Sequence, residues 1–196
     1  MRRFLILFVL AFLCFSSNAQ KASDYEVFVK KNFPEFVKHF KDFDFKNFTL
    51  EDTQQLDLTK NGEVFKPKEW SDFLKSDSEF FIYNTSKKYA VNFNTYGDID
   101  QAVLLIDVNK RQYHKLTFCG TPCRFEEAKW VNNKVLVLVG SYEDNDKYDE
   151  VNQQSKYFGM LLIVDLEKNT KTTYLNHVNE SLTFFTGKLF KDKNWD

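Results

Sequence analysis

The sequence predicts an α+β protein in which an antiparallel β meander of about eight or more strands carries N-terminal helices on one face. Apolar residues repeat at helical spacing before residue 42, and strand-like apolar runs dominate after residue 79. Polar turns of a few residues join these runs in pairs. The 196 residues are enough for one structural domain, residues 20–196, behind a short leader.

The first 19 residues have the organisation of a secretory signal peptide. Arg2 and Arg3 precede an apolar run from Phe4 to Leu13, and a small-residue cleavage position follows at Ala19. This run is too short to cross a bilayer, which takes about 20 apolar residues. We therefore expect an extracytoplasmic protein, periplasmic or secreted, with no membrane span after the leader is cleaved.

The charge balance argues against one class of partner. The chain has 27 Lys and Arg against 28 Asp and Glu, and loss of the leader's two Arg changes the formal charge from -1 to -3. Proteins that bind nucleic acid normally carry a basic surplus, so we expect no nucleic-acid partner. The 43% hydrophobic content excludes wholesale disorder.

Residues 20–78 are predicted to form a helical N-terminal segment that packs on the sheet. Ser23 and Glu26 have the spacing of a capping box at the start of a helix. Pro34 interrupts the following apolar stripe and predicts two short helices or one kinked helix. The stripe itself consists of Tyr25, Phe28, Val29, Phe33, Phe36, Val37 and Phe40.

The second half of this segment has a weaker pattern. Asn61-Gly62 is typical of a tight turn and indicates a hairpin between Leu58 and Val64. Helical turns are expected over Lys68–Leu74, after Pro67.

Residues 79–196 are predicted to be an antiparallel β region. Three runs are continuously apolar and predict strands that are covered on both faces: Ala102–Ile106, Val135–Val139 and Met160–Val164. The run Tyr89–Asn94 instead alternates apolar and small or polar residues, which is typical of a half-exposed strand. Residues 176–196 fit a strand and a helix equally.

A weak internal repeat lies inside this region. Leu104–Lys110 parallels Leu161–Lys168, and each copy has a hydrophobic strand, an Asp and a polar turn. Over residues 79–175 this arrangement resembles the blade units of β-propellers, and the chain is also similar to exported bacterial domains of unknown function. Because a propeller needs about four to eight blades, the resemblance implies consecutive antiparallel strands rather than a propeller.

Cys119 and Cys123 are the cysteines that remain after the leader. In an oxidising compartment, an even pair beside Gly120 and Pro122 indicates a disulfide that closes a tight loop. The spacing is not the Cys-x-x-Cys of redox-active pairs, and no His lies near enough in sequence to indicate a zinc site.

The candidate binding residues lie in two acidic loops at equivalent positions of the repeat. We expect the two loops to lie at the same end of the sheet. Each loop combines carboxylates with tyrosine: Tyr96, Asp98 and Asp100 in the first, and Tyr142, Asp144 and Asp146 in the second.

The second loop also has a spacing that calcium ligands use. Asp144, Asp146 and Glu150 fall at alternating positions, but Tyr148 breaks the series and no Gly permits the sharp turn of a calcium loop. We therefore predict a solvated loop and no bound metal, with a weak calcium site as the alternative.

The function indicated is binding rather than catalysis. The chain lacks the sequence motifs of nucleotide binding, zinc proteolysis and serine hydrolysis, and its three histidines are scattered. His114 is expected to be a structural residue of a strand. We expect a protein or glycan partner and no cofactor. The alternative is a carboxylate-dependent hydrolase acting on polysaccharide or peptidoglycan.

Overall fold

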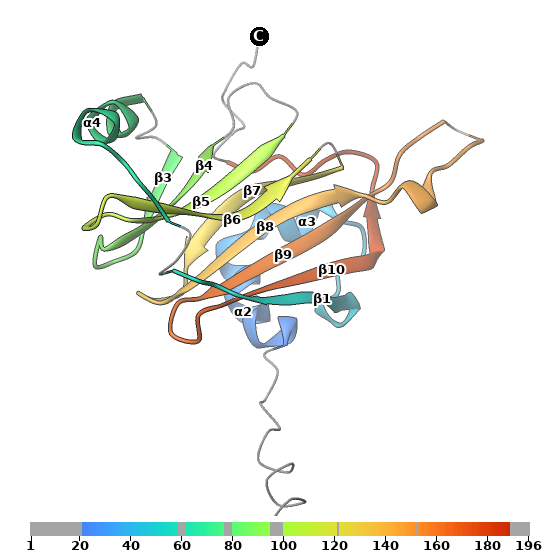
Figure 1. Cartoon of the computed structure of the whole chain (residues 1–196). Helices are drawn as coiled ribbons and strands as arrows, with labels where there is room; N and C mark the ends of the chain where they lie inside the picture. Colours follow the sequence, from blue (N-terminus) through green and yellow to red (C-terminus); the bar gives the residue numbers. More distant parts are fainter. Residues whose placement is uncertain are drawn as a thin grey trace, which may run out of the picture.

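The computed structural model describes residues 21–58, 62–76, 80–94, 100–120, 122–151 and 153–188 (Figure 1). These residues form an α+β fold with ten strands in two antiparallel five-stranded sheets, which confirms the predicted class. The predicted leader, residues 1–19, lies outside the described residues. Within them, no helix combines the length and the apolar character that crossing a membrane requires.

Sheet A contains the first strand of the chain and the last four. Its spatial order is β1-β10-β9-β8-β7. Its strands are β1 (Phe48–Gln55), β7 (Cys123–Trp130), β8 (Val135–Glu143), β9 (Tyr157–Asp165) and β10 (Thr170–Ser181).

Sheet B is formed by the contiguous part of the chain between β1 and β7, so it is an insertion within sheet A. Its spatial order is β2-β6-β5-β4-β3. Its strands are β2 (Glu63–Val64), β3 (Phe81–Tyr83), β4 (Tyr89–Asn94), β5 (Gln101–Asp107) and β6 (Gln112–Cys119).

The two sheets have the same topology. In each, four consecutive strands form a meander, and a strand from earlier in the chain pairs with the last of the four. The sequence repeat marks this equivalence, because its two copies lie on β5 and β9, the central strands of sheets B and A. The strand-like runs that short polar turns join form antiparallel pairs, as expected: β3 with β4, β5 with β6, β7 with β8 and β9 with β10.

The sheets pack face to face around a shared apolar core. Because successive side chains of a strand point to opposite faces, each continuous apolar run sends one set of side chains inward and the other outward. The inward set includes Val103, Leu105, Leu136, Leu138, Leu162 and Val164. The outward set includes Leu104, Ile106, Val137, Val139, Leu161 and Ile163.

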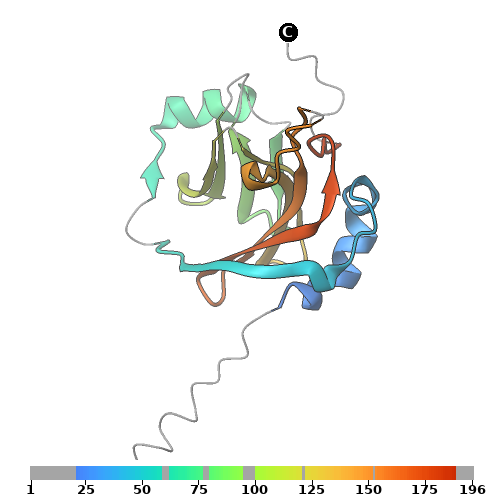
Figure 2. The same ribbon diagram turned by 90° about the vertical axis from the view of Figure 1, so that its right-hand side faces the viewer.

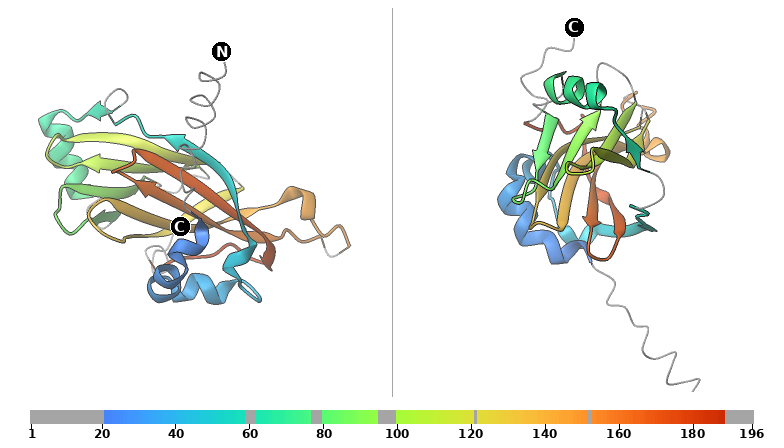
Figure 3. Two further views of the ribbon diagram at one scale, coloured as in Figure 1. Left: turned by 90° about the horizontal axis from the view of Figure 1, so that it is seen from below. Right: turned by 60° about the vertical axis from the view of Figure 1, so that its left-hand side comes forward.

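Helices cover both outer faces, and Figures 2 and 3 show them on opposite sides of the sheets. α2 (Glu26–Asn32) and α3 (Pro34–His39) lie over sheet A, where Val29, Phe33 and Phe36 are buried. α4 (Pro67–Ser76) lies over sheet B, where Trp70 packs on Leu104 and Ile106. The three apolar runs are therefore covered on both faces, as predicted.

Pro34 is the first residue of α3, which confirms two short helices rather than one kinked helix. The predicted cap at Ser23 is wrong. A single 3-10 turn (Ala22–Tyr25) precedes α2, and its capping interaction is made by the Lys21 N–H, which donates to Asp24 Oδ2 at 2.9 Å.

The strand β4 is not half-exposed, contrary to its alternating pattern. Ala90 and Asn92 are as fully buried as Val91 and Phe93. The reason is that α4 covers this face of sheet B, with Trp70 and Ala90 in one cluster of buried side chains. A helix from elsewhere in the sequence thus buries a face that looks polar locally.

Asn61 of the expected hairpin lies outside the described residues, and the described strands on either side of it do not pair with each other. β1 pairs with β10 in sheet A, whereas β2 pairs with β6 in sheet B. The segment 20–78 therefore supplies an edge strand to each sheet in addition to its helices, and its expected helix after Pro67 is α4.

The end of the described chain packs on sheet A. Residues 176–181 continue β10, and residues 182–188 follow without regular structure. Phe185 is buried against α3, with its ring centroid 5.3 Å from that of Phe36. The Phe185 N–H donates to Ser141 Oγ at 3.0 Å, and the Gly187 N–H donates to Glu126 Oε2 at 3.2 Å.

Candidate functional site

The Cys119–Cys123 disulfide closes the turn by which the chain passes from sheet B to sheet A. Cys119 ends β6 and Cys123 begins β7, with their Cα atoms 5.2 Å apart. The Cys123 N–H donates to Gly120 O at 3.0 Å, so the turn is closed by a hydrogen bond as well. The predicted disulfide is therefore confirmed, and it links the last strand of sheet B covalently to the first strand of the sheet A meander.

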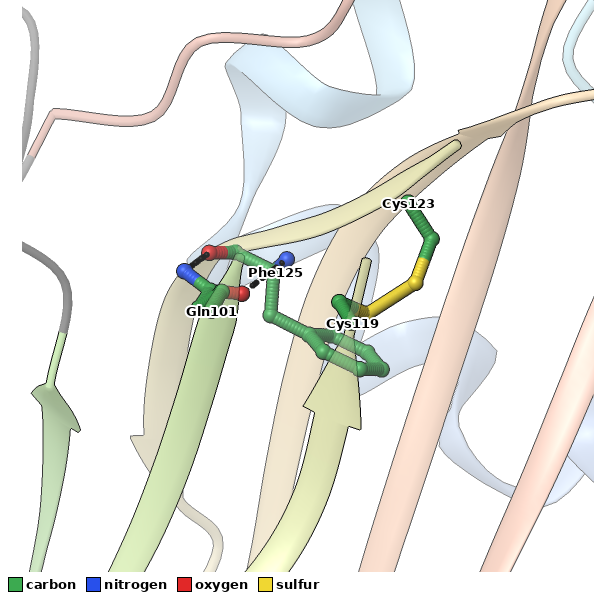
Figure 4. Close-up of a disulfide and its surroundings, with 4 residues drawn as sticks. All are labelled: Gln101, Cys119, Cys123 and Phe125. Atoms are coloured by element: carbon green, nitrogen blue, oxygen red, sulfur yellow. Dashed lines mark hydrogen bonds between the residues drawn. A yellow bond between two sulfur atoms is a disulfide. The ribbon is translucent and has the colours of Figure 1, made fainter. Parts of the chain in front are cut away.

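A buried glutamine beside the disulfide links the two sheets a second time, through hydrogen bonds (Figure 4). Gln101 begins β5 in sheet B, and its side-chain amide bonds to the backbone of Phe125 in β7 of sheet A. Its Nε2 donates to Phe125 O, and the Phe125 N–H donates to its Oε1, both at 2.7 Å. The amide thus satisfies one backbone donor and one acceptor as a neighbouring strand would.

An apolar cleft of about 260 Å³ opens between the sheets, next to the disulfide and the Gln101 hydrogen bonds. Sheet A lines it with Phe125, Tyr142, Met160 and Leu175, among others. Sheet B contributes residues 117–119 of β6, and the disulfide itself forms part of the wall. Concave, mostly apolar sites with a few polar groups at the edge are typical ligand sites.

Tyr142 is the predicted site residue that lines this cleft. Its hydroxyl group lies 3.1 Å from Asn176 O and 2.8 Å from His177 Nδ1, so the phenol is held in place by β10. Burial raises the pKa of Tyr142, and the negative charges of Asp144 and Glu51 raise it further. The phenol is therefore neutral, and its ring is a fixed part of the cleft wall.

The acidic loop after β8 folds on itself through local hydrogen bonds. Asp144 Oδ1 accepts the Asp146 N–H at 3.2 Å and caps a 3-10 turn (Asn145–Lys147). Lys147 Nζ lies 3.7 Å from Asp144 Oδ2 and 4.3 Å from the centroid of the Phe158 ring. Among the described residues, no group of three or more His, Cys, Asp or Glu side chains could hold a metal ion, and the Asp144, Asp146 and Glu150 set is not such a group.

The two predicted acidic loops flank the disulfide turn. In the first loop, Asp100 is exposed and its Oδ1 lies 3.6 Å from the point where a Cβ on Gly120 would lie. In the second, the Glu143 N–H donates to Pro122 O at 2.6 Å. Asp100 and Glu143 thus lie on either side of residues 119–123. Tyr96 and Asp98 lie outside the described residues.

Glu143 lines the cleft, and three further carboxylates lie near its wall: Glu51 and Asp144 act on Tyr142, and Asp100 lies beside Gly120. We call Glu51, Asp100, Glu143 and Asp144 the acidic rim. Glu51 is exposed on β1, at the position where the pairing of β1 with β10 shifts register. Glu143 lines the cleft and accepts a hydrogen bond from the Ser155 hydroxyl. Sequence reasoning missed Glu51, since only the pairing of β1 with β10 brings it here.

The most perturbed carboxyl group lies outside the cleft. Glu126 on β7 is buried, and burial raises its pKa to about 7. Its carboxylate lies 2.6 Å from Arg124 Nε and accepts the Gly187 N–H. Glu126 thus holds the C-terminal segment on sheet A, and it lacks the access to substrate that a general acid needs.

His114 is a buried strand residue, as predicted. Burial and the nearby charge of Lys110 lower its pKa. It lies at the opposite end of β6 from the cleft, beside Leu58 and Tyr89. His114 therefore does not belong to the candidate site.

The geometry equips this site to hold an apolar group and to attract positive charge. No protein-family model matches the chain, and searches of the curated proteins and of the solved structures yield no significant match.

Proposed function

We propose that this protein is an exported, non-catalytic binding domain that recognises a partner protein through the cleft between its sheets. The observation that carries the proposal is the combination of an apolar cleft of about 260 Å³ with the acidic rim around it. Such a combination provides apolar burial for affinity and charge for orientation and specificity.

Three features favour a protein over a glycan as the partner. The cleft wall consists mainly of aliphatic, aromatic and disulfide groups. The Tyr142 hydroxyl donates its one proton to Asn176 O, so it is not free to donate to a sugar hydroxyl. The carboxylates that face solvent lie on the rim, where Lys and Arg side chains of a protein can reach them.

The first test compares the partners that two variants capture. Thr173 lines the cleft on β10, so Thr173→Trp should occupy the cleft with an indole ring. Thr53→Trp is the matched control, since Thr53 is exposed on β1 and bonds to Thr172 rather than lining the cleft. Mature wild-type protein and Thr53→Trp should retain the same partner from the exported fraction, and Thr173→Trp should lose it. Equal capture by all three proteins contradicts the proposal.

The hydrolase alternative is tested by the acidic residues. If the wild-type protein cleaves polysaccharide or peptidoglycan, and Asp100→Ala, Asp144→Ala or Asp146→Ala abolishes that turnover, the protein is an enzyme. A binding domain should show graded losses of affinity instead, because rim charges contribute about 1 kcal/mol or less each.

Export is tested on the native protein. Its mass should correspond to a chain that begins at Gln20 and contains an oxidised Cys119–Cys123 pair. An intracellular protein with an intact leader and two free thiols contradicts this part of the proposal.

A further inference from the structure

One edge of sheet B is less covered than its equivalent in sheet A. β1 pairs with β10 from Phe48 to Gln55, so the last strand of that meander has a partner along most of its length. β2 holds the equivalent position beside β6 but pairs only with Gln112 and Tyr113. Within the described part of the chain, no strand pairs with residues 114–119 on the side of β6 away from β5.

An unpaired strand edge presents backbone donors and acceptors that can accept another strand. One of these acceptors on β6, Leu116 O, is bonded by the Nζ of Lys171, which reaches across from β10. Lys171 is half-buried, and burial lowers its pKa. The Lys171 side chain therefore gives the Leu116 carbonyl group a hydrogen-bond partner. The outward backbone groups of residues 117–119 stay available to solvent or to a ligand.

The unpaired edge borders the cleft. Thr117 and Phe118 of β6 line the cleft together with Thr173 and Leu175 of β10. Phe118 is 56% exposed, an unusual value for a large apolar side chain next to a core. An apolar cavity of roughly 150 Å³ accommodates benzene, so this cleft has room for a large aliphatic or aromatic side chain.

The carboxylates without ion pairs favour a basic ligand, since the two lysines at this edge are engaged elsewhere: Lys115 Nζ lies 5.5 Å from the centroid of the Phe118 ring, and Lys171 Nζ donates to Leu116 O. Glu51, Asp100 and Glu143 of the acidic rim form no ion pair within the described ranges. Lys147 is already paired with Asp144. A second copy of this chain would bring the same acidic rim and a formal charge of -3, so it is a poorer occupant than a basic segment.

We propose that the partner contributes an extended segment that pairs with β6 between His114 and Cys119, places an apolar side chain in the cleft and directs Lys or Arg at the acidic rim. This inference rests on the proposed function and adds the mode of binding. In strand addition, backbone hydrogen bonds provide affinity and pockets for alternate side chains provide specificity.

The test uses labelled nine-residue peptides as probes with the mature protein. The basic probe alternates Leu or Val with Lys or Thr, the acidic probe has Glu for each Lys, and a third probe has the basic sequence with alternate backbone nitrogens methylated. We expect the basic probe to bind about tenfold or more tighter than either of the others at low salt. Its binding should slow hydrogen exchange at residues 114–119, whereas β3, an edge strand far from the cleft, should be unaffected.

Protein variants provide an independent readout. Glu51→Lys should weaken binding of the basic probe about tenfold at low salt, and the loss should shrink at high salt. Glu150→Lys is the control, because Glu150 lies outside the acidic rim. Thr173→Trp should abolish binding of the probe.

The outcomes separate this inference from the proposed function. Strand addition is wrong if the basic probe binds without slowing hydrogen exchange at residues 114–119, or if the methylated probe binds equally well. It is also wrong if the protein forms dimers that protect these residues in the absence of any probe. If the probes fail and Thr173→Trp still loses a native partner, strand addition is wrong and the proposed function stands. If Thr173→Trp captures that partner like the wild type, both are wrong.

Discussion

Asp107 and Asp165 hold the same position in the two sheets, each as the last residue of a central strand. Asp107 Oδ1 accepts the Lys110 N–H at 3.1 Å, and Asp165 Oδ1 accepts the Lys168 N–H at 3.0 Å. Both carboxylates also lie within 3.7 Å of the ammonium group of that same lysine. The sequence repeat therefore encodes a turn that is closed by an aspartate cap.

We expect Asp165→Ala to destabilise the protein more than Asp107→Ala does. Asp165 accepts two backbone N–H groups, from Glu167 and Lys168, whereas Asp107, which is equally buried, accepts one. Loss of such a cap costs about 1–2 kcal/mol of unfolding free energy. Urea unfolding measures the difference, with the exposed Asp146→Ala as the control. Equal midpoints for Asp165→Ala and Asp107→Ala, or for Asp165→Ala and this control, contradict the prediction.

Glu126 should make stability fall as the pH rises. Its folded-state pKa of about 7 exceeds its ordinary value of 4.5, so the folded state binds the proton more tightly than the unfolded state. The resulting stabilisation is complete below pH 4.5, and is lost as the pH rises toward 7, by on the order of 3 kcal/mol.

Unfolding of Glu126→Gln between pH 5 and 8 tests this. The Gln side chain still accepts the Gly187 N–H but does not titrate, so the variant should lose less stability than the wild type across this range. Glu167→Gln, on an exposed turn, should follow the wild type. Parallel pH profiles for the wild type and Glu126→Gln show that Glu126 is not the titrating group.

Gly140 should not tolerate a larger residue. It faces the register shift of β7, and a Cβ there would lie 2.1 Å from Arg124 O and 2.7 Å from Phe125 Cα. Backbone atoms cannot move aside as a flexible side chain can, so we expect Gly140→Ala to cost about 1–3 kcal/mol. Gly120→Ala is the matched control, since its Cβ would meet nothing closer than 3.6 Å. A similar thermal midpoint for both variants refutes this expectation.

Asn92 is a site where an apolar residue should stabilise the fold. It is fully buried, and within the described residues neither its Oδ1 nor its Nδ2 has a hydrogen-bond partner. Because burial of an unsatisfied polar group costs about 1–3 kcal/mol, Asn92→Leu should raise the free energy of unfolding.

Asn176→Leu is the control for Asn92→Leu. Asn176 is equally buried, but its Oδ1 accepts two backbone N–H groups and its Nδ2 donates to Asn179. This substitution should destabilise the protein. A loss of stability in both leucine variants indicates that the Asn92 amide is hydrogen-bonded in solution.

Local patterns predicted the positions of strands β3 to β10 and the disulfide. Continuous apolar runs such as Val135–Val139 report burial on both faces directly, and the short spacing of Cys119 and Cys123 makes their pairing a local property. The division into two sheets was not predicted, because it depends on the pairing of β1 with β10, more than 100 residues apart in the chain.

The candidate site was predicted in part. Tyr142 and Asp100 lie at the disulfide end of the sandwich because the repeat places their loops at equivalent strand ends. Gln101 and Glu126 gave no sequence signal, since a single polar residue at a strand gains its meaning from a partner on another element. The burial of Asn92 likewise depends on α4.

The insertion of sheet B between β1 and β7 has a mechanical consequence. Both ends of the described chain pack on sheet A, so tension between them bears first on that sheet and bypasses sheet B. Because Phe48 pairs with Asn176 at the end where β1 begins, a pull there peels β1 from β10 one residue pair at a time rather than shearing all pairs at once. Stretching would thus draw β1, and with it Glu51 of the acidic rim, away from β10 while the β6 edge stays folded.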